Sequence, residues 1–231
     1  MCDQQNSYHR RSALVMLTLS CALAVGTASA GRIDGSKHDF GGLNWSAGEI
    51  CIVCHTPHNA KTDVDDAPLW NHRVTGETFE MYSSLTLDAQ LEDKPTGHSL
   101  LCLSCHDGQT AIDAYGEDDV NPGTGTISDF YPGTTADLGT DLSNDHPISF
   151  VYDSNLATDD GALWNPDDAA HQVTIGSGDR QRTGTINEVM LYDGFLQCSS
   201  CHDVHNNFVS AEGHYLLRIS NADSGLCMTC H

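Results

Sequence analysis

Apolar residues in this chain come in short runs, separated by polar residues that favour turns. Three runs have the apolar or alternating character of β-strands, and they lie at Ile148–Tyr152, Gln172–Ile175 and Glu188–Tyr192. The stretch Thr86–Leu91 has the pattern of a small helix. The long region between residues 106 and 198 is rich in Gly, Asp, Asn and Thr, a composition typical of loops. The pattern predicts mostly irregular coil with a few short helices and short strands or hairpins.

The N-terminal thirty residues have a different pattern. Arg10 and Arg11 precede an apolar run over Ala13–Val25, and small residues follow up to Ala30. A basic start, a short apolar middle and a small-residue cleavage site predict a secretory signal peptide over residues 1–30. The run is too short to indicate a membrane span. We therefore expect an exported mature chain, residues 31–231, that forms one domain and keeps no stable membrane span.

Composition and charge exclude some partners. The chain has 231 residues, of which 39% are hydrophobic, so its apolar core would be thin for its length. The net charge of −22 argues against nucleic acid, because phosphates are bound by Lys and Arg. An acidic surface of this kind favours solubility and cationic or metal partners.

Eight of the ten cysteines fall into four copies of one motif, Cys-x-x-Cys-His. The copies span Cys51–His55, Cys102–His106, Cys198–His202 and Cys227–His231. A disulfide scaffold would not place every cysteine at the same spacing with a histidine after it each time. One helical turn brings residues i and i+3 to one face, so both thiols of a motif can reach the two vinyl groups of one haem.

The motif therefore predicts four covalently attached haem c groups. The thiols would come from Cys51, Cys54, Cys102, Cys105, Cys198, Cys201, Cys227 and Cys230, and the proximal iron ligands would be His55, His106, His202 and His231. Four haems would also supply the apolar core that the composition lacks. Zinc sites and thiol redox sites use Cys-x-x-Cys too, but neither requires a histidine directly after it four times. Acidic clusters such as Asp63, Asp65 and Asp66 leave calcium open, although none matches an EF-hand loop.

Each iron needs a second axial ligand or keeps an open position. Eight histidines outside the motifs remain after signal removal, against three methionines, so bis-His ligation is favoured. This ligation lowers the reduction potential relative to His/Met ligation.

Two of these histidines follow a motif at the same distance. His58 lies three residues after His55, and His205 lies three residues after His202. Three residues span at most about 10 Å, which is barely enough to pass around a haem edge to the other face of the same iron. We therefore expect both histidines to bind neighbouring haems, and Pro57 to redirect the first of them.

His38 and His146 are the other two candidates for distal ligands, since each follows a chain reversal. The remaining histidines outside the motifs rank below these four, and they are His72, His98, His171 and His214.

Several segments resemble the exported multihaem cytochromes with doubled Cys-x-x-Cys-His motifs, and among these the OmcE-like tetrahaem cytochromes. The segments are Ser36–Phe40, Gly48–Asn59, Pro68–His72, Leu101–Gly108, Asp145–Phe150 and Cys198–Asn206. The resemblance implies bis-His haems stacked in a continuous row, polymerisation into extracellular electron-conducting filaments, and a distal histidine donated by an adjacent subunit, for which His38 is a plausible donor. The sequence ends on His231, so either residues are missing after it or the terminus lies against the last haem.

The expected function is electron transfer without catalysis, either in a filament built from copies of this chain or as a soluble periplasmic shuttle. Both readings imply other redox proteins as donors and acceptors. A multihaem oxidoreductase is a weaker alternative, because it needs an open haem position and distal histidines are plentiful here. A haem or metal store is a third reading.

Overall fold

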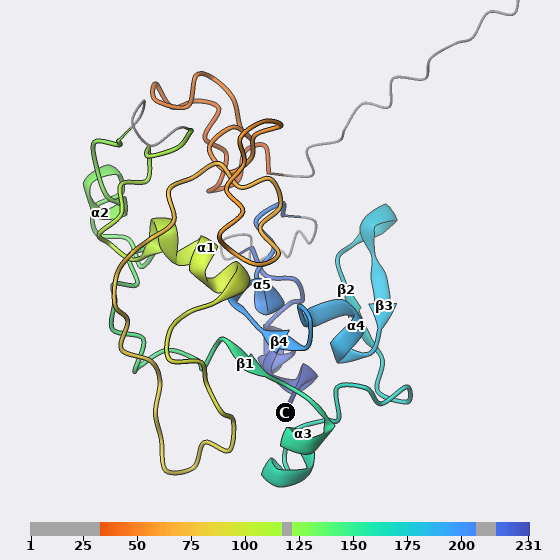
Figure 1. Cartoon of the computed structure of the whole chain (residues 1–231). Coiled ribbons are helices and arrows are strands. Elements are labelled where there is room, and N and C mark those ends of the chain that lie inside the picture. The colour runs from red at the N-terminus through yellow and green to blue at the C-terminus, as the bar shows by residue number, and fades with distance from the viewer. Residues whose placement is uncertain (1–32, 117–121, 207–215) are drawn as a thin grey trace, which may run out of the picture.

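The computed structural model describes residues 33–116, 122–206 and 216–231, so the expected signal peptide at residues 1–30 lies outside the described residues. Helices and strands are few and short, and turns and irregular segments connect them (Figure 1). The helices are α1 (Gly97–His106), α2 (Ile127–Phe130), α3 (Ser154–Asp160), α4 (Ile186–Met190) and α5 (Cys198–Cys201), with 3-10 turns η1 (Gly178–Arg180), η2 (Ala222–Ser224) and η3 (Cys227–Thr229). The strands are β1 (Phe150–Val151), β2 (Val173–Ile175), β3 (Arg182–Gly184) and β4 (Phe195–Leu196). None of the helices described has the length and apolar character needed to cross a membrane.

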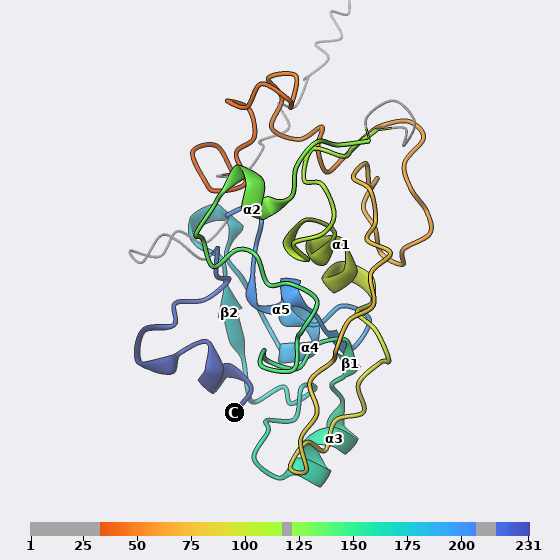
Figure 2. The same ribbon diagram turned by 90° about the vertical axis from the view of Figure 1, so that its left-hand side faces the viewer.

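The strands form two small antiparallel pairs. β2 pairs with β3, and β1 pairs with β4 although the two are far apart in the sequence. α4 packs on the β2–β3 pair, which projects at one side of the molecule, and α5 contacts both α4 and α1 (Figures 1 and 2). α5 therefore lies between the N-terminal part of the chain and the C-terminal strands.

α1 is the longest helix and carries the second motif. Thr96 precedes it in extended conformation, and the buried residues Leu101 and Leu103 point to opposite sides of the helix, each into a different apolar cluster. The helix ends where Gly108 adopts a φ of 69°, a left-handed conformation that favours glycine. The second motif is therefore held in a regular, packed helix.

Two of the three predicted strands are confirmed, since β1 and β2 lie within the predicted ranges. The strand predicted over Glu188–Tyr192 is wrong, because most of that range is the helix α4. The Thr185 hydroxyl accepts the Glu188 N–H at 3.3 Å, and the Glu188 carboxylate accepts the Thr185 N–H at 2.8 Å. This capping box starts a helix, which overrides the β-prone side chains that follow it.

The strand β4 was missed, and a tight turn explains its position. Asp193 and Gly194 have φ values of 50° and 79°, and backbone hydrogen bonds in both directions join Tyr192 to Phe195. An Asp-Gly pair with two positive φ values is a hairpin turn signal. The chain therefore reverses directly after α4 and leads β4 into the third motif.

The helix predicted over Thr86–Leu91 is also wrong. The Ser84 hydroxyl accepts the Thr86 N–H at 3.2 Å, and this local bond stabilises a turn in place of a helix. Leu91 then forms a β-bridge with Phe150. The apolar residues of this stretch thus join the core as extended chain.

The buried apolar residues that the structure describes form three clusters, and the partly buried Ile148 packs against two of them. The largest is built mainly from β1, α3, β2, α4 and β4, so it lies in the region between the second and third motifs. A second cluster holds Val64, Trp70 and Leu101, and a third holds Phe79, Leu103 and Leu142. Cys54 packs on the second cluster and Cys230 on the largest. The motifs therefore border the apolar clusters, and the core around four haems stays a prediction.

Candidate functional site

Each of the four motifs forms a helical turn. The histidine N–H donates to the carbonyl of the first cysteine in the first, third and fourth motifs, at 2.9 Å for His55, 3.1 Å for His202 and 3.1 Å for His231. The second motif lies at the C-terminal end of α1. All eight motif cysteines carry free thiols. The turn places the two thiols of each motif toward one side, as the Cys-x-x-Cys spacing predicts.

The first and third motifs share one backbone arrangement beyond the motif itself. The residue after each motif histidine donates its N–H to the carbonyl of a leucine that is distant in the sequence. This leucine is Leu69 for the first motif, at 2.9 Å, and Leu216 for the third motif, at 2.6 Å. Both leucines have positive φ, of 54° and 52°. Asn59 and Asn206, four residues after the motif histidines, also match, with φ values of 56° and 51°. Positive φ is rare for leucine, so its occurrence at matching positions indicates an internal structural duplication.

The second and fourth motifs follow these two segments, so the described chain contains two halves of similar order. The first half holds the first and second motifs, and the second half holds the third and fourth. The repeated Cys-x-x-Cys-His-x-x-His-Asn pattern was visible in the sequence, but the matching leucines had no signal there. The regions between the motifs of each half differ in length.

The motif sulfurs approach one another in sequence order. Burial raises the pKa of Cys105, and the neighbouring Cys54 adds a smaller effect in the same direction. A hydrogen bond between the thiols of Cys102 and Cys198 raises the pKa of Cys102 and lowers that of Cys198. Burial raises the pKa of Cys201 to about 11, and Cys227 is among the neighbours that add to this shift. Each motif therefore has a cysteine near a cysteine of the next motif along the chain.

Among the described residues, two pairs of imidazole rings lie close together, and each pair contains a motif histidine. The ring centres of His38 and His106 are 6.0 Å apart with their planes at 48°, and those of His55 and His205 are 6.1 Å apart with their planes at 17°. Two imidazoles that bind one metal ion from opposite sides, each through a bond of about 2 Å, have ring centres about 6 Å apart. The spacing of both pairs fits one metal ion between the rings.

The motif histidine of each pair is fixed through its other ring nitrogen. Nδ1 of His55 lies 2.6 Å from the Pro68 carbonyl, and Nδ1 of His106 lies 2.6 Å from the Ala136 carbonyl. Because a carbonyl only accepts, Nδ1 must carry the proton in both rings, and Nε2 is left with its lone pair. Orientation of a ligand histidine by a backbone carbonyl is the usual outer-shell support of a metal site.

His38 is suited to act as a neutral ligand. Burial, assisted by the nearby ring of His106, lowers the pKa of His38 to about 4, so the ring is uncharged at neutral pH. Its Nδ1 is buried and has no hydrogen-bond partner among the residues that the structure describes. The sequence suggested His38 as a donor to an adjacent subunit, whereas the structure places its ring against His106 of the same chain.

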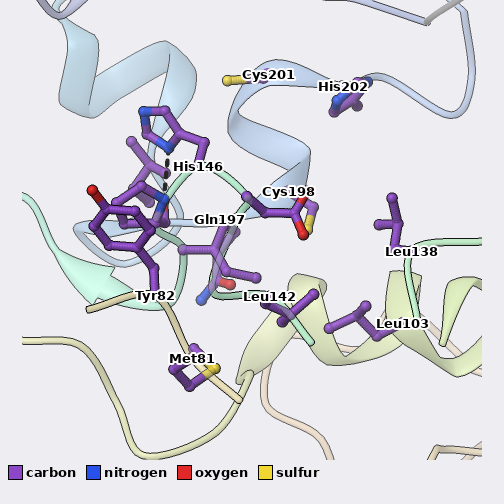
Figure 3. A pocket seen from close by; sticks show the side chains of 14 residues that line it. Met81, Tyr82, Leu103, Leu138, Leu142, His146, Gln197, Cys198, Cys201 and His202 are labelled. Carbon is purple, nitrogen blue, oxygen red and sulfur yellow. Dashed lines mark hydrogen bonds between the residues drawn. The ribbon is translucent and has the colours of Figure 1, made fainter. Parts of the chain in front are cut away.

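A cavity of about 210 Å³ lies beside the third motif. Cys198, Cys201 and His202 line it together with the predicted distal ligand His146, and apolar side chains such as Leu142 cover other parts of its wall (Figure 3). Nδ1 of His146 bonds the Pro147 carbonyl at 2.8 Å, which leaves its Nε2 with a lone pair. The structure thus brings one predicted distal ligand and the whole third motif to one cavity.

The fourth motif is held by residues that the sequence analysis did not select. The Trp164 N–H donates to the Cys230 carbonyl at 2.8 Å, and Nε2 of His171 bonds the Thr229 carbonyl at 2.9 Å. The His171 ring stacks on Trp164 with centres 4.4 Å apart, and the buried Tyr152 hydroxyl bonds the Trp164 carbonyl at 2.6 Å. Nothing in the residue pattern around these three positions signals a motif contact.

Within the residues that the structure describes, the other histidines outside the motifs are not paired with a motif histidine. His72 is fully buried, with Nδ1 2.8 Å from the Arg73 carbonyl and Nε2 3.5 Å from the thiol of Cys105. His98 bonds Ser199 and the Asp66 carbonyl. The predicted ligand His58 is exposed, and in the described part of the chain no second imidazole faces it or His231. His214 lies outside the described residues.

Across residues 33–116, 122–206 and 216–231, no three His, Cys, Asp or Glu side chains gather in a way that would hold a metal ion directly. The paired imidazoles would need the four in-plane ligands of a macrocycle to complete a metal's coordination. The thiols beside them are the groups that could attach such a macrocycle.

No protein-family model matches the chain, and a search of curated proteins finds no match either. The resemblance to OmcE-like cytochromes therefore rests on the motif segments alone.

Proposed function

We propose that this chain is an exported c-type cytochrome that carries four haems and transfers electrons. The observation that supports this most is the spacing of the two imidazole pairs, since each pairs a motif histidine with a histidine from elsewhere in the chain. When bound, each haem iron supplies a centre that takes up and releases one electron. The protein's part is to attach, orient and space the four groups.

The residues have separate roles in this proposal. The eight motif thiols hold the haems covalently, and the four motif histidines are proximal ligands. His38 completes the coordination at the second motif, His205 at the first and His146 at the third. The carbonyls of Pro68 and Ala136 fix the ring orientation of His55 and His106. With an imidazole from each of two histidines, haems at these three sites would have no open position for a substrate.

Intact-mass measurement of the secreted protein tests the cofactor directly. Expression in a bacterium that attaches c-type haem should add the mass of four haems to the chain that starts after residue 30. Replacement of both cysteines in one motif with alanine should remove one haem and leave three. A secreted protein without bound haem would refute the proposal.

A multihaem oxidoreductase remains a second candidate because of the fourth motif. In the part of the chain that the structure describes, no imidazole faces His231. An open position there would bind a small ligand. If the ferrous protein binds no carbon monoxide, the oxidoreductase loses its site, and if one haem binds it, the fourth motif is the place to examine by replacing His231.

The setting of electron transfer follows from the same proposal. Export favours the cell surface or periplasm, with redox proteins as donors and acceptors. The filament made of copies of this chain rests on the motif resemblance, and the soluble shuttle is its alternative. Electron microscopy of concentrated secreted protein separates them, because filaments support the first and single particles support the second.

A further inference from the structure

A buried polar network joins α1 to α5. The Ser99 hydroxyl donates to Oε1 of Gln197 at 2.5 Å and accepts the Cys198 N–H at 3.0 Å. The Ser149 hydroxyl lies 3.3 Å from the same Gln197 oxygen and accepts the Thr96 N–H at 3.0 Å. The network thus reaches from the residue before α1 to the first residue of α5.

The members of this network are among the most buried polar residues described. The side chains of Ser99 and Ser149 are 0% exposed, and that of Gln197 is 4% exposed. Buried polar groups cost free energy unless they are hydrogen-bonded, and here each has partners. An apolar contact between the two helices would be less directional, so the network fixes one relative placement of α1 and α5.

The network lies directly between the second and third motifs. Ser99 is one helical turn before Cys102, and Gln197 directly precedes Cys198. The thiols of Cys102 and Cys198 are themselves in hydrogen-bond contact. These two motifs belong to different halves of the duplicated chain, so this junction is one of the places where the halves meet.

We propose that Ser99, Gln197 and Ser149 are positioning residues that fix the second motif against the third and thereby set the electron step between the two halves. The inference rests on the proposed haem-carrying function. Electron transfer between cofactors weakens steeply as they separate, so the residues that hold two attachment sites together control that step. Gln197 also lines the cavity beside the third motif.

Gln197→Met tests the proposal, because it keeps the length of the side chain and removes its hydrogen bonds. We expect the holoprotein to retain four haems and the spin states of the wild type. Its bisignate Soret circular dichroism, which arises from coupling between neighbouring haems, should lose amplitude, and the potential of at least one haem should shift. Gln197→Glu keeps the acceptor oxygen for Ser99 and Ser149, so it should restore the Soret signal.

Thr174→Val serves as a matched control. It removes a 2.8 Å hydrogen bond between the exposed side chains of Thr174 and Thr183 on the β2–β3 pair, and should leave the Soret signal unchanged. If Gln197→Met does not accumulate, Ser99→Ala, which keeps Gln197, takes its place with the same expected result. A variant with four haems and an unaltered Soret signal and potentials would overturn the proposal. Absence of haem from the wild-type protein would instead refute the proposed function.

Discussion

At the scale of single residues, the position of the His205 ring gives the most specific prediction about a haem ligand. It lies 6.1 Å from the ring of His55, although the two belong to different motif segments. The sequence predicted that His205 serves a neighbouring haem, and the structure offers the first motif as that neighbour. His205 therefore links the two halves of the chain at the level of one side chain.

Replacement of His205 with alanine should leave one of the four haems without its distal imidazole. That haem should become high-spin and bind carbon monoxide when reduced, since an axial position is open. Electron paramagnetic resonance and absorption spectra of the purified protein measure both. His171→Phe is the control, because it keeps a ring on Trp164 and should leave the haem at the first motif with the same spectra as in the wild type. Low-spin spectra in the His205 variant would contradict the pairing.

Asp113 gives a prediction for stability against pH. Burial raises the pKa of Asp113. Hydrogen bonds from the Thr124 N–H and hydroxyl, each at 2.7 Å, and from the Gly125 N–H lower this pKa by a larger amount, so it lies below its usual value. A carboxyl group with a lowered pKa adds stability above its unfolded pKa of about 3.9, and this stability is lost as pH falls through the folded value.

Asp113→Ala should therefore lower the free energy of unfolding by about 1–3 kcal/mol at pH 7, because it leaves buried donors without an acceptor. The difference from the wild type should shrink as pH falls below about 4, as protonation weakens the same bonds in the wild type. Urea unfolding at both pH values measures it, and the exposed Asp179→Ala serves as control. An equal difference at both pH values would point to lost packing instead.

At the scale of elements, α4 depends on its capping box. Thr185→Ala should destabilise the protein by about 1 kcal/mol, because the Glu188 N–H loses its acceptor at the helix start. Glu188→Gln should cost less, since glutamine also serves in a capping box. Denaturant unfolding compares the two variants. Equal losses would show that the charge of Glu188 matters more than the reciprocal bonds.

α4 also shows what the sequence could and could not predict. The motif turns and the strands β1 and β2 followed from local spacing and alternation, which the fold preserves. The segment 188–192 was predicted as a strand because of its β-prone residues, although Thr185, three positions upstream, caps a helix there. The strand pairing of β1 with β4 was out of reach, since it joins residues that are distant in the sequence. Local patterns carry no information about such partners.

The candidate site divides along the same line. The eight thiols and four motif histidines could be selected as candidates because the Cys-x-x-Cys-His motif consists of residues close together in the sequence. The pairing of His38 with His106 required the folded chain, and so did the contacts of Tyr152, Trp164 and His171 with the fourth motif. These depend on tertiary placement alone.

At the scale of the whole molecule, the pairing of His38 decides whether the second motif needs a neighbouring subunit. Because the ring centre of His38 lies 6.0 Å from that of His106 in the same chain, a haem bound there should stay low-spin when any filaments or oligomers are diluted to single molecules. Absorption and magnetic spectra over a dilution series measure this, with His38→Ala as the reference for a lost ligand. A high-spin haem that appears only on dilution would show that an axial ligand comes from another copy.

The contact between His55 and His205 has a consequence for biogenesis. An exported chain emerges from the membrane with its N-terminus leading, so the first motif arrives early and His205 arrives near the end. If His205 completes the first site, that site stays unfinished while most of the chain is still crossing. A truncated or stalled chain would hold a haem at Cys51 and Cys54 with one face open to oxidants and to quality-control proteases. Completion of the first site would thus report that nearly the whole polypeptide has been delivered.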